Sequence, residues 1–253
     1  MPLEIVTVPC RADNYAFLLH NAASGQTALI DAPEAGAIRA ALDSRGWTLS
    51  DLFITHHHDD HIAGVAALRP GARVIGNAAD AHRLPPLDLA VHPGDTITLC
   101  GEPGQIIDVP GHTVGHIALH LPNRRAAFTA DSLMALGCGR LLEGTAQQMW
   151  DSLTRLAALP RDTLICSGHE YTAANGRFAI TIEPDNLDLQ ARIANITIVR
   201  SQGIATVPST LDLELRTNPF LRAGLASIKA SLNMATAHDV DSFAEIRARK
   251  DRF

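Results

Sequence analysis

The sequence has no long apolar run and no excess of positive charge. No segment approaches the roughly 20 apolar residues that a helix needs to cross a bilayer, and the first residues include Glu4 and no apolar core of signal-peptide length. The net charge of -6 argues against general affinity for nucleic acid. We therefore expect a cytoplasmic protein without membrane association, without a nucleic-acid partner and without an obligate protein partner.

Cysteine is also scarce. The four cysteines are widely separated and form no C-x-x-C pair, and the chain has no short repeat and no low-complexity stretch. We interpret the cysteines as buried free thiols in a reducing compartment rather than as a disulfide framework. They are Cys10, Cys100, Cys138 and Cys166.

The chain is long enough for one large domain or two. Its 253 residues are 46% hydrophobic and 19% charged, which is typical of a globular protein. Short apolar runs separated by turn residues predict strands first and then alternating strands and helices. The expected strands cover residues 3–8, 14–19, 27–31, 51–54, 73–75, 96–99 and 105–109, and the expected helices cover residues 35–44, 62–68, 186–201, 221–232 and 239–249.

Histidine is concentrated in one turn, where residues 55–61 read THHHDDH. The turn follows an apolar strand-like run and precedes an apolar helix-like run. His56 and His58 face the same way in an extended segment, whereas Asp60 and His61 come one turn later. Imidazole together with carboxylate suits zinc, manganese or iron. The alternative is a solvated turn or a purification tag, but a tag would stand at a terminus without strand and helix signals beside it.

Three further apolar runs end in the same residue types. His112, Asp131 and His169 each stand at or just beyond the end of a strand-like run. A lone aspartate there is usually a turn or cap residue, so only the repeated layout makes Asp131 a candidate ligand. The candidate metal ligands are His56, His58, Asp60, His61, His112, Asp131 and His169.

Seven ligands are too many for one tetrahedral zinc ion, and they suit two divalent ions that share a carboxylate and a water. His116 is expected to have a structural hydrogen-bonding role rather than to bind metal. The other histidines lack such a context and are interpreted as surface or hydrogen-bonded residues. They are His20, His82, His92, His120 and His238.

The motif H-x-H-x-D-H at residues 56–61 resembles the signature of the metallo-β-lactamase superfamily. Nearly the whole chain resembles one family within it, glyoxalase II or hydroxyacylglutathione hydrolase. The matching segments are residues 13–15, 55–61, 111–113, 115–116, 129–131, 137–140, 143–145, 168–172, 207–211, 218–222 and 249–253. The resemblance implies an α/β (α+β) fold, with an αββα sandwich as a catalytic domain over residues 1–171 and a smaller helical substrate-binding domain over residues 172–253.

The resemblance also implies roles for individual residues. One ion would be held by His56, His58 and His112. The second would be held by Asp60, His61 and His169. Asp131 would bridge the ions, and Asp60 and Asp131 would be catalytic. Zinc is the expected metal, with iron or manganese as alternatives. The positions that resemble glutathione-binding residues are Arg140, Tyr171, Arg247 and Lys250, whereas Leu142 stands where some members have tyrosine.

The implied reaction is hydrolysis of S-D-lactoylglutathione to glutathione and D-lactate by a metal-bound hydroxide. A side-chain nucleophile is not required: Ser132 and Ser167 lie outside any G-x-S-x-G motif, and Cys138 has no obvious dedicated base. Side chains expected to support the ligands are Asp31, His57 and Asp59.

Other functions remain open on the sequence. A mono-iron persulfide dioxygenase of the same superfamily would share the first ligand set, although the complete second set argues against it. A lactonase would share both sets without needing the glutathione-side residues. A β-lactamase is disfavoured because dinuclear members commonly have cysteine where Asp131 stands. A non-enzymatic metal-binding protein would have to keep seven ligands without chemistry.

Overall fold

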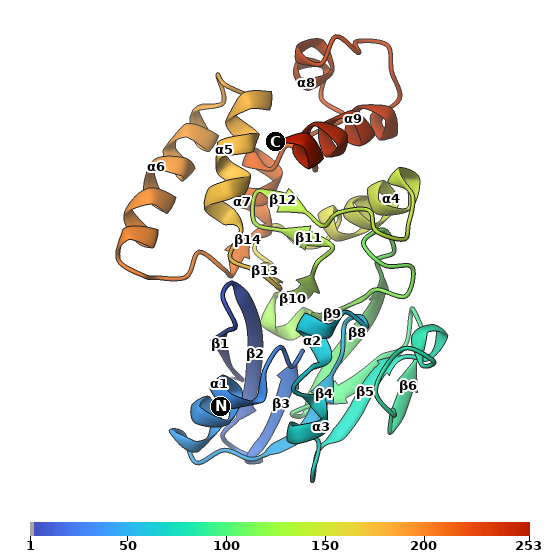
Figure 1. Ribbon diagram of the computed structural model, residues 1–253, viewed down its shortest axis with the longest axis vertical. Helices are drawn as coiled ribbons and strands as arrows, with labels where there is room; N and C mark the ends of the chain where they lie inside the picture. Colours follow the sequence, from blue (N-terminus) through green and yellow to red (C-terminus); the bar gives the residue numbers. More distant parts are fainter. Residues whose placement is uncertain (1–2) are drawn as a thin grey trace. The chain divides into compact units, whose positions relative to one another are not determined.

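The computed structural model describes residues 3–253, which divide into two compact units (Figure 1). The first unit contains the chain up to Asp108 together with Gly115–Ala130, and the second contains Val109–Val114 and Asp131–Phe253. The chain therefore enters the second unit for a few residues, returns to the first, and then leaves it. Within residues 3–253, no helix combines the length and the apolar character that crossing a bilayer would require.

The first unit opens with a six-stranded sheet in the order β1 to β6. The strands are β1 Glu4–Cys10, β2 Asn14–Asn21, β3 Gln26–Ile30, β4 Leu49–Phe53, β5 Arg73–Asn77 and β6 Leu89–Val91. β1 to β3 are antiparallel, whereas β3 to β6 are parallel. The parallel connections carry α1 Ala35–Asp43, α2 Asp59–Ile62, α3 Val65–Leu68 and the 3-10 helix η1 Ala78–Asp80. The carboxyl ends of β3, β4 and β5 consequently meet at one edge, which is where open α/β sheets carry their sites.

The first unit also contains four strands of a second sheet, each antiparallel to the next. They are β7 Thr96–Leu99, β8 Glu102–Asp108, β9 Ile117–Leu121 and β10 Ala126–Ala130, with the 3-10 helix η2 Pro122–Arg124 between β9 and β10.

Alternation along β2 explains how the first sheet is covered on both faces. Ala16 and Leu18 belong to a buried cluster that includes Ile38 of α1. Phe17 points the opposite way, and its ring centroid lies 5.5 Å from that of Phe128 in β10. Because successive side chains of a strand point to opposite faces, one face packs against helices and the other against the second sheet.

The second unit is mainly helical. Its elements are β11 Leu133–Met134, β12 Gly137–Cys138, α4 Ala146–Ala157, β13 Leu164–Ser167, α5 Thr172–Ile182, α6 Leu187–Ser201, β14 Ser209–Thr210, α7 Leu211–Thr217, α8 Ala226–Ser231 and α9 Asp239–Arg252. α4 begins with a capping box, in which Thr145 and Gln148 bond each other's backbone. α5 and α6 pack on each other through a buried cluster that contains Ala179 and Leu189.

The strands predicted from sequence are confirmed to within a few residues, but two predicted helices are wrong in extent. Residues 62–68 do not form one helix, because the chain is interrupted at Gly64 between α2 and α3. The Gly64 amide donates to the Ala32 carbonyl at 2.8 Å, and a Cβ at position 64 would lie 3.0 Å from that oxygen. α8 covers only Ala226–Ser231 of the predicted 221–232, since the residues before it form turns.

Candidate metal centre

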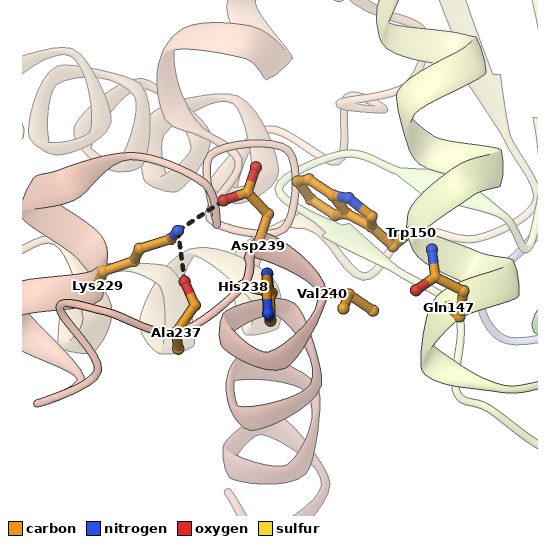
Figure 2. A pocket seen from close by; sticks show the side chains of 7 residues that line it. All are labelled: Gln147, Trp150, Lys229, Ala237, His238, Asp239 and Val240. Carbon is orange, nitrogen blue, oxygen red and sulfur yellow. Dashed lines mark hydrogen bonds and ion pairs between the residues drawn. The ribbon is translucent and has the colours of Figure 1, made fainter.

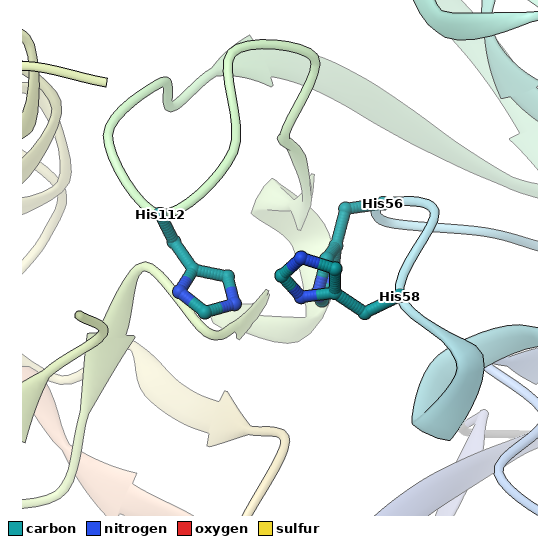
Figure 3. Close-up of side chains that lie close together, drawn as sticks. All are labelled: His56, His58 and His112. Atoms are coloured by element: carbon teal, nitrogen blue, oxygen red, sulfur yellow. The ribbon is translucent and has the colours of Figure 1, made fainter. Parts of the chain in front are cut away.

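The first unit carries two buried or half-buried histidines directly after β4. Figure 3 shows the rings of His56 and His58 beside each other, and it shows His112 on a separate loop. His56 Nε2 lies 3.1 Å from His58 Nδ1. A tetrahedral zinc ion bound at roughly 2.0–2.1 Å holds two nitrogen ligands about 3.3 Å apart. The spacing of these two nitrogens therefore fits a shared divalent ion.

Asp60 and His61 lie on α2 itself, because that helix begins at Asp59. Asp60 Oδ2 lies 3.8 Å from His61 Nε2. The buried side chain of Asn14 donates to Asp60 Oδ2 at 3.0 Å and to the Asp60 carbonyl at 3.1 Å. Asn14 therefore orients the carboxylate, a role that the sequence did not predict.

Asp31 fixes the ring of His61. Both side chains are buried, and His61 Nδ1 donates to Asp31 Oδ2 at 2.8 Å. A carboxylate can only accept, so Nδ1 carries the hydrogen and Nε2 keeps its lone pair for a metal. The same carboxylate accepts from the amide and the hydroxyl of Thr55, at 2.9 and 2.8 Å. This is the support expected of Asp31 from sequence.

The neighbouring polar residues have other partners. His57 Nδ1 bonds Asp80 Oδ2 at 2.9 Å, and Asp80 also accepts from Arg83 at 2.6 Å. The exposed carboxylate of Asp59 bonds the Arg11 guanidinium at 2.7 Å. These bonds join His57 and Asp59 to residues other than the predicted metal ligands.

His116 is fully buried and lies flat against the ring of His56. The two ring centroids are 4.6 Å apart with an angle of 14° between the rings. His116 Nδ1 lies 3.2 Å from the carbonyl of Ile117. Stacking holds the His56 ring from one side, which suits the structural role expected of His116.

The second unit carries three buried ligand candidates, two histidines and the aspartate that lies near both. Asp131 Oδ2 lies 3.4 Å from His112 Nε2 and 3.4 Å from His169 Nε2. His112 Nδ1 donates to the Arg140 carbonyl at 2.9 Å, so its Nε2 also keeps a lone pair. A Cβ at Gly139 would lie 2.0 Å from the Asp131 carbonyl oxygen, so only glycine fits this turn.

The donor chemistry of both sets fits a divalent metal. The candidates of the first unit and those of the second unit each consist of imidazoles and a carboxylate, which are ligands of zinc, iron and manganese. His61 and His112 each donate a hydrogen bond from Nδ1 to a protein oxygen, the arrangement typical of metal-binding histidines. The seven residues belong to the histidine and aspartate groups that could hold a metal ion.

The predicted glutathione-side residues differ in exposure. Arg140 is exposed, and the ring of Tyr171, a residue that is 38% exposed, stacks on His169 with centroids 4.6 Å apart. Arg247 is only 5% exposed and donates to the Cys138 carbonyl at 2.9 Å. Lys250 is half-buried and donates to the Ala174 carbonyl at 3.2 Å. Leu142 is exposed. A role for these residues in substrate binding stays a prediction.

The cysteines are confirmed as buried and free. Burial raises the pKa of Cys138 to about 11, and it likewise raises the pKa of Cys10 to about 12. A thiol with so high a pKa is a weak nucleophile at neutral pH, because the thiolate is the reactive form.

A surface pocket of about 350 Å³ lies at the start of α9 and contains none of the predicted site residues (Figure 2). The Lys229 ammonium in it bonds Asp239 at 2.7 Å and the Ala237 carbonyl at 2.7 Å. Its charge is already compensated, so the pocket does not offer a free cation to an anionic ligand.

The chain matches two family models. Residues 13–169 match the metallo-beta-lactamase superfamily, and residues 170–253 match the hydroxyacylglutathione hydrolase C-terminus. Among solved structures, ETHE1 from Myxococcus xanthus covers 98% of this chain and 90% of its own length, with a TM-score of 0.68 at 26% identity. The BLEG-1 B3 metallo-beta-lactamase covers 86% of this chain and 99% of its own, with a TM-score of 0.67 at 19% identity. Fold and site define a protein of the metallo-β-lactamase superfamily, which confirms the predicted fold class.

Full-length relatives narrow this class. Proteins named hydroxyacylglutathione hydrolase from Cereibacter sphaeroides and from Ruegeria pomeroyi are each 62% identical to this chain, over 100% of both sequences. The chain therefore belongs to the hydroxyacylglutathione hydrolase family.

Asp31→Asn tests how far the buried carboxylate supports the site. The amide cannot accept all three hydrogen bonds, so the His61 ring should lose its fixed orientation, and metal affinity should fall by roughly 10–100-fold. Competition with a chelator measures this affinity. The control is Asp51→Asn, which removes another buried carboxylate of the same sheet, paired with Arg73 at 2.8 Å. Equal affinities in the two variants would contradict the support role.

Proposed function

We propose that this protein hydrolyses 2-hydroxyacyl thioesters of glutathione, S-D-lactoylglutathione among them, to glutathione and the free acid. The observation that carries the proposal is the 62% identity over the full length to relatives named hydroxyacylglutathione hydrolase. The match of residues 170–253 to that family's own C-terminal model supports it independently of the metal-binding motif.

We further propose two divalent metal ions per chain, with zinc as the expected metal. The ligands of one ion would be His56, His58 and His112. Those of the other would be Asp60, His61 and His169. Asp131 would bridge them, and the equal 3.4 Å distances from its Oδ2 to His112 and His169 support that proposal, because these two histidines are proposed as ligands of different ions. A relative in structure, TTHA1623, is described in a di-iron-bound form, at 25% identity and a TM-score of 0.61. It covers 86% of this chain and 100% of its own.

When bound, such ions lower the pKa of a coordinated water and polarise the thioester carbonyl. The side chains of this protein then have distinct tasks. Asn14 and Asp31 hold Asp60 and His61 in place. The side chain of Asp60 is more accessible than that of Asp131, the other proposed carboxylate ligand. Asp60 is therefore the proposed proton acceptor and orienting group.

The glutathione part of the substrate carries carboxylates, so cationic and hydrogen-bonding partners are expected. The proposed partners are Arg140, Tyr171, Arg247 and Lys250. All four come from the second unit, and the proposed boundary between the catalytic and the substrate-binding domain is at residues 171/172. The four buried free thiols support a reducing compartment such as the cytoplasm.

A substrate panel tests the proposal. The metal-loaded protein should hydrolyse S-D-lactoylglutathione much faster than a lactone or a β-lactam, and it should consume no oxygen with glutathione persulfide. Elemental analysis should give two metal ions per chain. Oxygen uptake with a single bound iron would instead identify a persulfide dioxygenase.

Asp131→Ala should remove the shared ligand. We expect loss of at least one metal ion, and a fall in kcat larger than the roughly 10–100-fold typical of an outer-shell partner. Metal content and thioester hydrolysis are measured on the same sample. Asp151→Ala, which removes an exposed carboxylate of α4, is the control. Full metal content with normal turnover in Asp131→Ala would refute the bridge.

Lys250 should make substrate binding sensitive to pH. Burial is the largest cause that lowers its pKa from 10.5 to about 8. The charges of Arg247, Arg177 and Arg140 lower it further, and Asp251 acts in the opposite direction. The ammonium is thus charged below about pH 8 and lost above it.

If that ammonium binds a glutathione carboxylate, KM should rise between pH 7 and pH 9. A charge-assisted hydrogen bond is worth about 1.5–3 kcal/mol, so the rise should reach about tenfold. Lys250→Arg stays charged and should flatten it. A small thioester without the carboxylate serves as the control substrate. Matching pH profiles of KM for wild type and Lys250→Arg would exclude this role.

A further inference from the structure

The segment between Asp131 and Arg140 is a hairpin that is too short to be stable by itself. Its strands β11 and β12 pair through only two residue pairs, whereas even a longer isolated hairpin is marginally stable in water. Leu136 in its turn has a left-handed φ of 56°, which is unfavourable for a residue with a branched side chain. Something outside the hairpin has to fix its backbone.

Two buried asparagines bond the hairpin carbonyls. Asn218, at the end of α7, donates from Nδ2 to Met134 O at 3.1 Å and to Gly137 O at 3.0 Å. Asn175 of α5 donates to Ala135 O at 3.0 Å. Three carbonyls around the turn are thus held by side chains that lie about 40 and 80 positions further along the chain.

A buried glutamate accepts a hydrogen bond from the backbone of the turn. Glu214 of α7 accepts from the Leu136 amide at 2.9 Å and from Asn218 at 3.1 Å through Oε2. Its other oxygen accepts from Arg192 and from Ser209. The carboxylate is fully buried, and four donors satisfy it. A buried charge that is satisfied in this way resists displacement, because losing any one donor leaves an uncompensated group.

The residues of the turn are closely packed against α5 and α6. A Cβ at Gly137 would lie 2.5 Å from Asn175 Nδ2, so the backbone approaches the amide as closely as glycine permits. The side chain of Leu136 is buried in the cluster with Ala179 and Leu189 between α5 and α6. Polar and apolar contacts therefore fix the same two-residue turn.

Both ends of the hairpin connect to the proposed site. The Gly139 amide donates to Ser132 O at 3.2 Å, next to Asp131. The Arg140 carbonyl accepts from His112 Nδ1 at 2.9 Å. A shift of the turn would consequently move the proposed bridging carboxylate, the backbone partner of a proposed metal ligand and a proposed glutathione contact together.

We propose that Asn175, Glu214 and Asn218, here called the hairpin clamp, are positioning residues for Asp131 and Arg140. None of the three is a proposed metal ligand or a proposed glutathione contact. By fixing the backbone between those two residues, they let the helices of the second unit set metal retention and substrate affinity at the same time. This inference rests on the proposed function for its effect on substrate, but its effect on metal retention can be measured separately.

Asn218→Ala removes both carbonyl bonds to the hairpin. The matched control is Asn186→Ala, because Asn186 also donates to a backbone carbonyl, that of Arg216, at 2.9 Å. Each asparagine in addition accepts from a backbone amide two or three residues further on, at 3.1 Å. Both proteins are loaded with zinc, and transfer of the metal to a colorimetric chelator is followed. We expect transfer at least about tenfold faster from Asn218→Ala, with only a small change for Asn186→Ala.

Kinetics on the same proteins separate positioning from general loosening. Asn218→Ala should lower kcat and raise KM for S-D-lactoylglutathione, while Asn186→Ala should leave both near wild type at a comparable loss of thermal stability. If the two variants release zinc at equal rates, or if Asn218→Ala behaves as wild type, the clamp is refuted. If Asn218→Ala does not fold, Asn175→Ala decides. It removes a single bond to the turn and should show the same changes at smaller size, and wild-type behaviour in it refutes the clamp.

Different results would refute the proposed function and the proposed role of the hairpin clamp. A wild-type protein that does not hydrolyse the glutathione thioester refutes the function, whereas the zinc-transfer comparison still tests the clamp. A wild-type protein that hydrolyses it, together with equal behaviour of the two asparagine variants, refutes the clamp alone.

Discussion

The hydrogen bonds accepted by one buried carboxylate, that of Asp31, tie together three segments that are distant in sequence. The residue directly follows β3, its partner Thr55 follows β4, and its partner His61 lies on α2. Each bond uses a donor that would otherwise be buried without compensation, so the three segments cannot shift independently. The left-handed φ of 56° at Asp31 is the local cost of bringing the carboxylate to this point.

The second unit uses the same principle with a different residue. Glu214 is also buried and also accepts from backbone and side-chain donors of separate segments. In both units a carboxylate that can only accept hydrogen bonds defines where the surrounding donors have to lie. The order needed around the site therefore comes from saturated acceptors as much as from apolar packing.

Local patterns in the sequence were sufficient for the strands and for the clusters of candidate ligands. Apolar runs ending in histidine or aspartate predicted where β4 and β10 end, because strand length and polarity are local properties. The break at Gly64 was not predictable in the same way. It depends on a carbonyl from Ala32, which only the folded sheet brings next to it.

The partners of the site residues were the least predictable feature. Asn14 and Asp60 are 46 positions apart, and Leu136 and Glu214 are 78 positions apart. No periodicity links such pairs, since sheet topology and helix packing bring them together. For the same reason the sequence showed Arg247 as a basic residue on a terminal helix, but not that it is almost fully buried.

The brief passage of Val109–Val114 through the second unit has a consequence for how this chain can be recombined. The Pro110 carbonyl accepts from Ser152 at 2.7 Å, and Gly111 faces Met149 so closely that a Cβ would lie 2.7 Å from that side chain. A chimera cut once, after residue 130, would take this loop from one parent and α4 from the other. Residues up to 130 and residues after 130 therefore cannot be exchanged independently between relatives. Substitutions in α4 have to be matched in a loop that precedes it by some 40 positions.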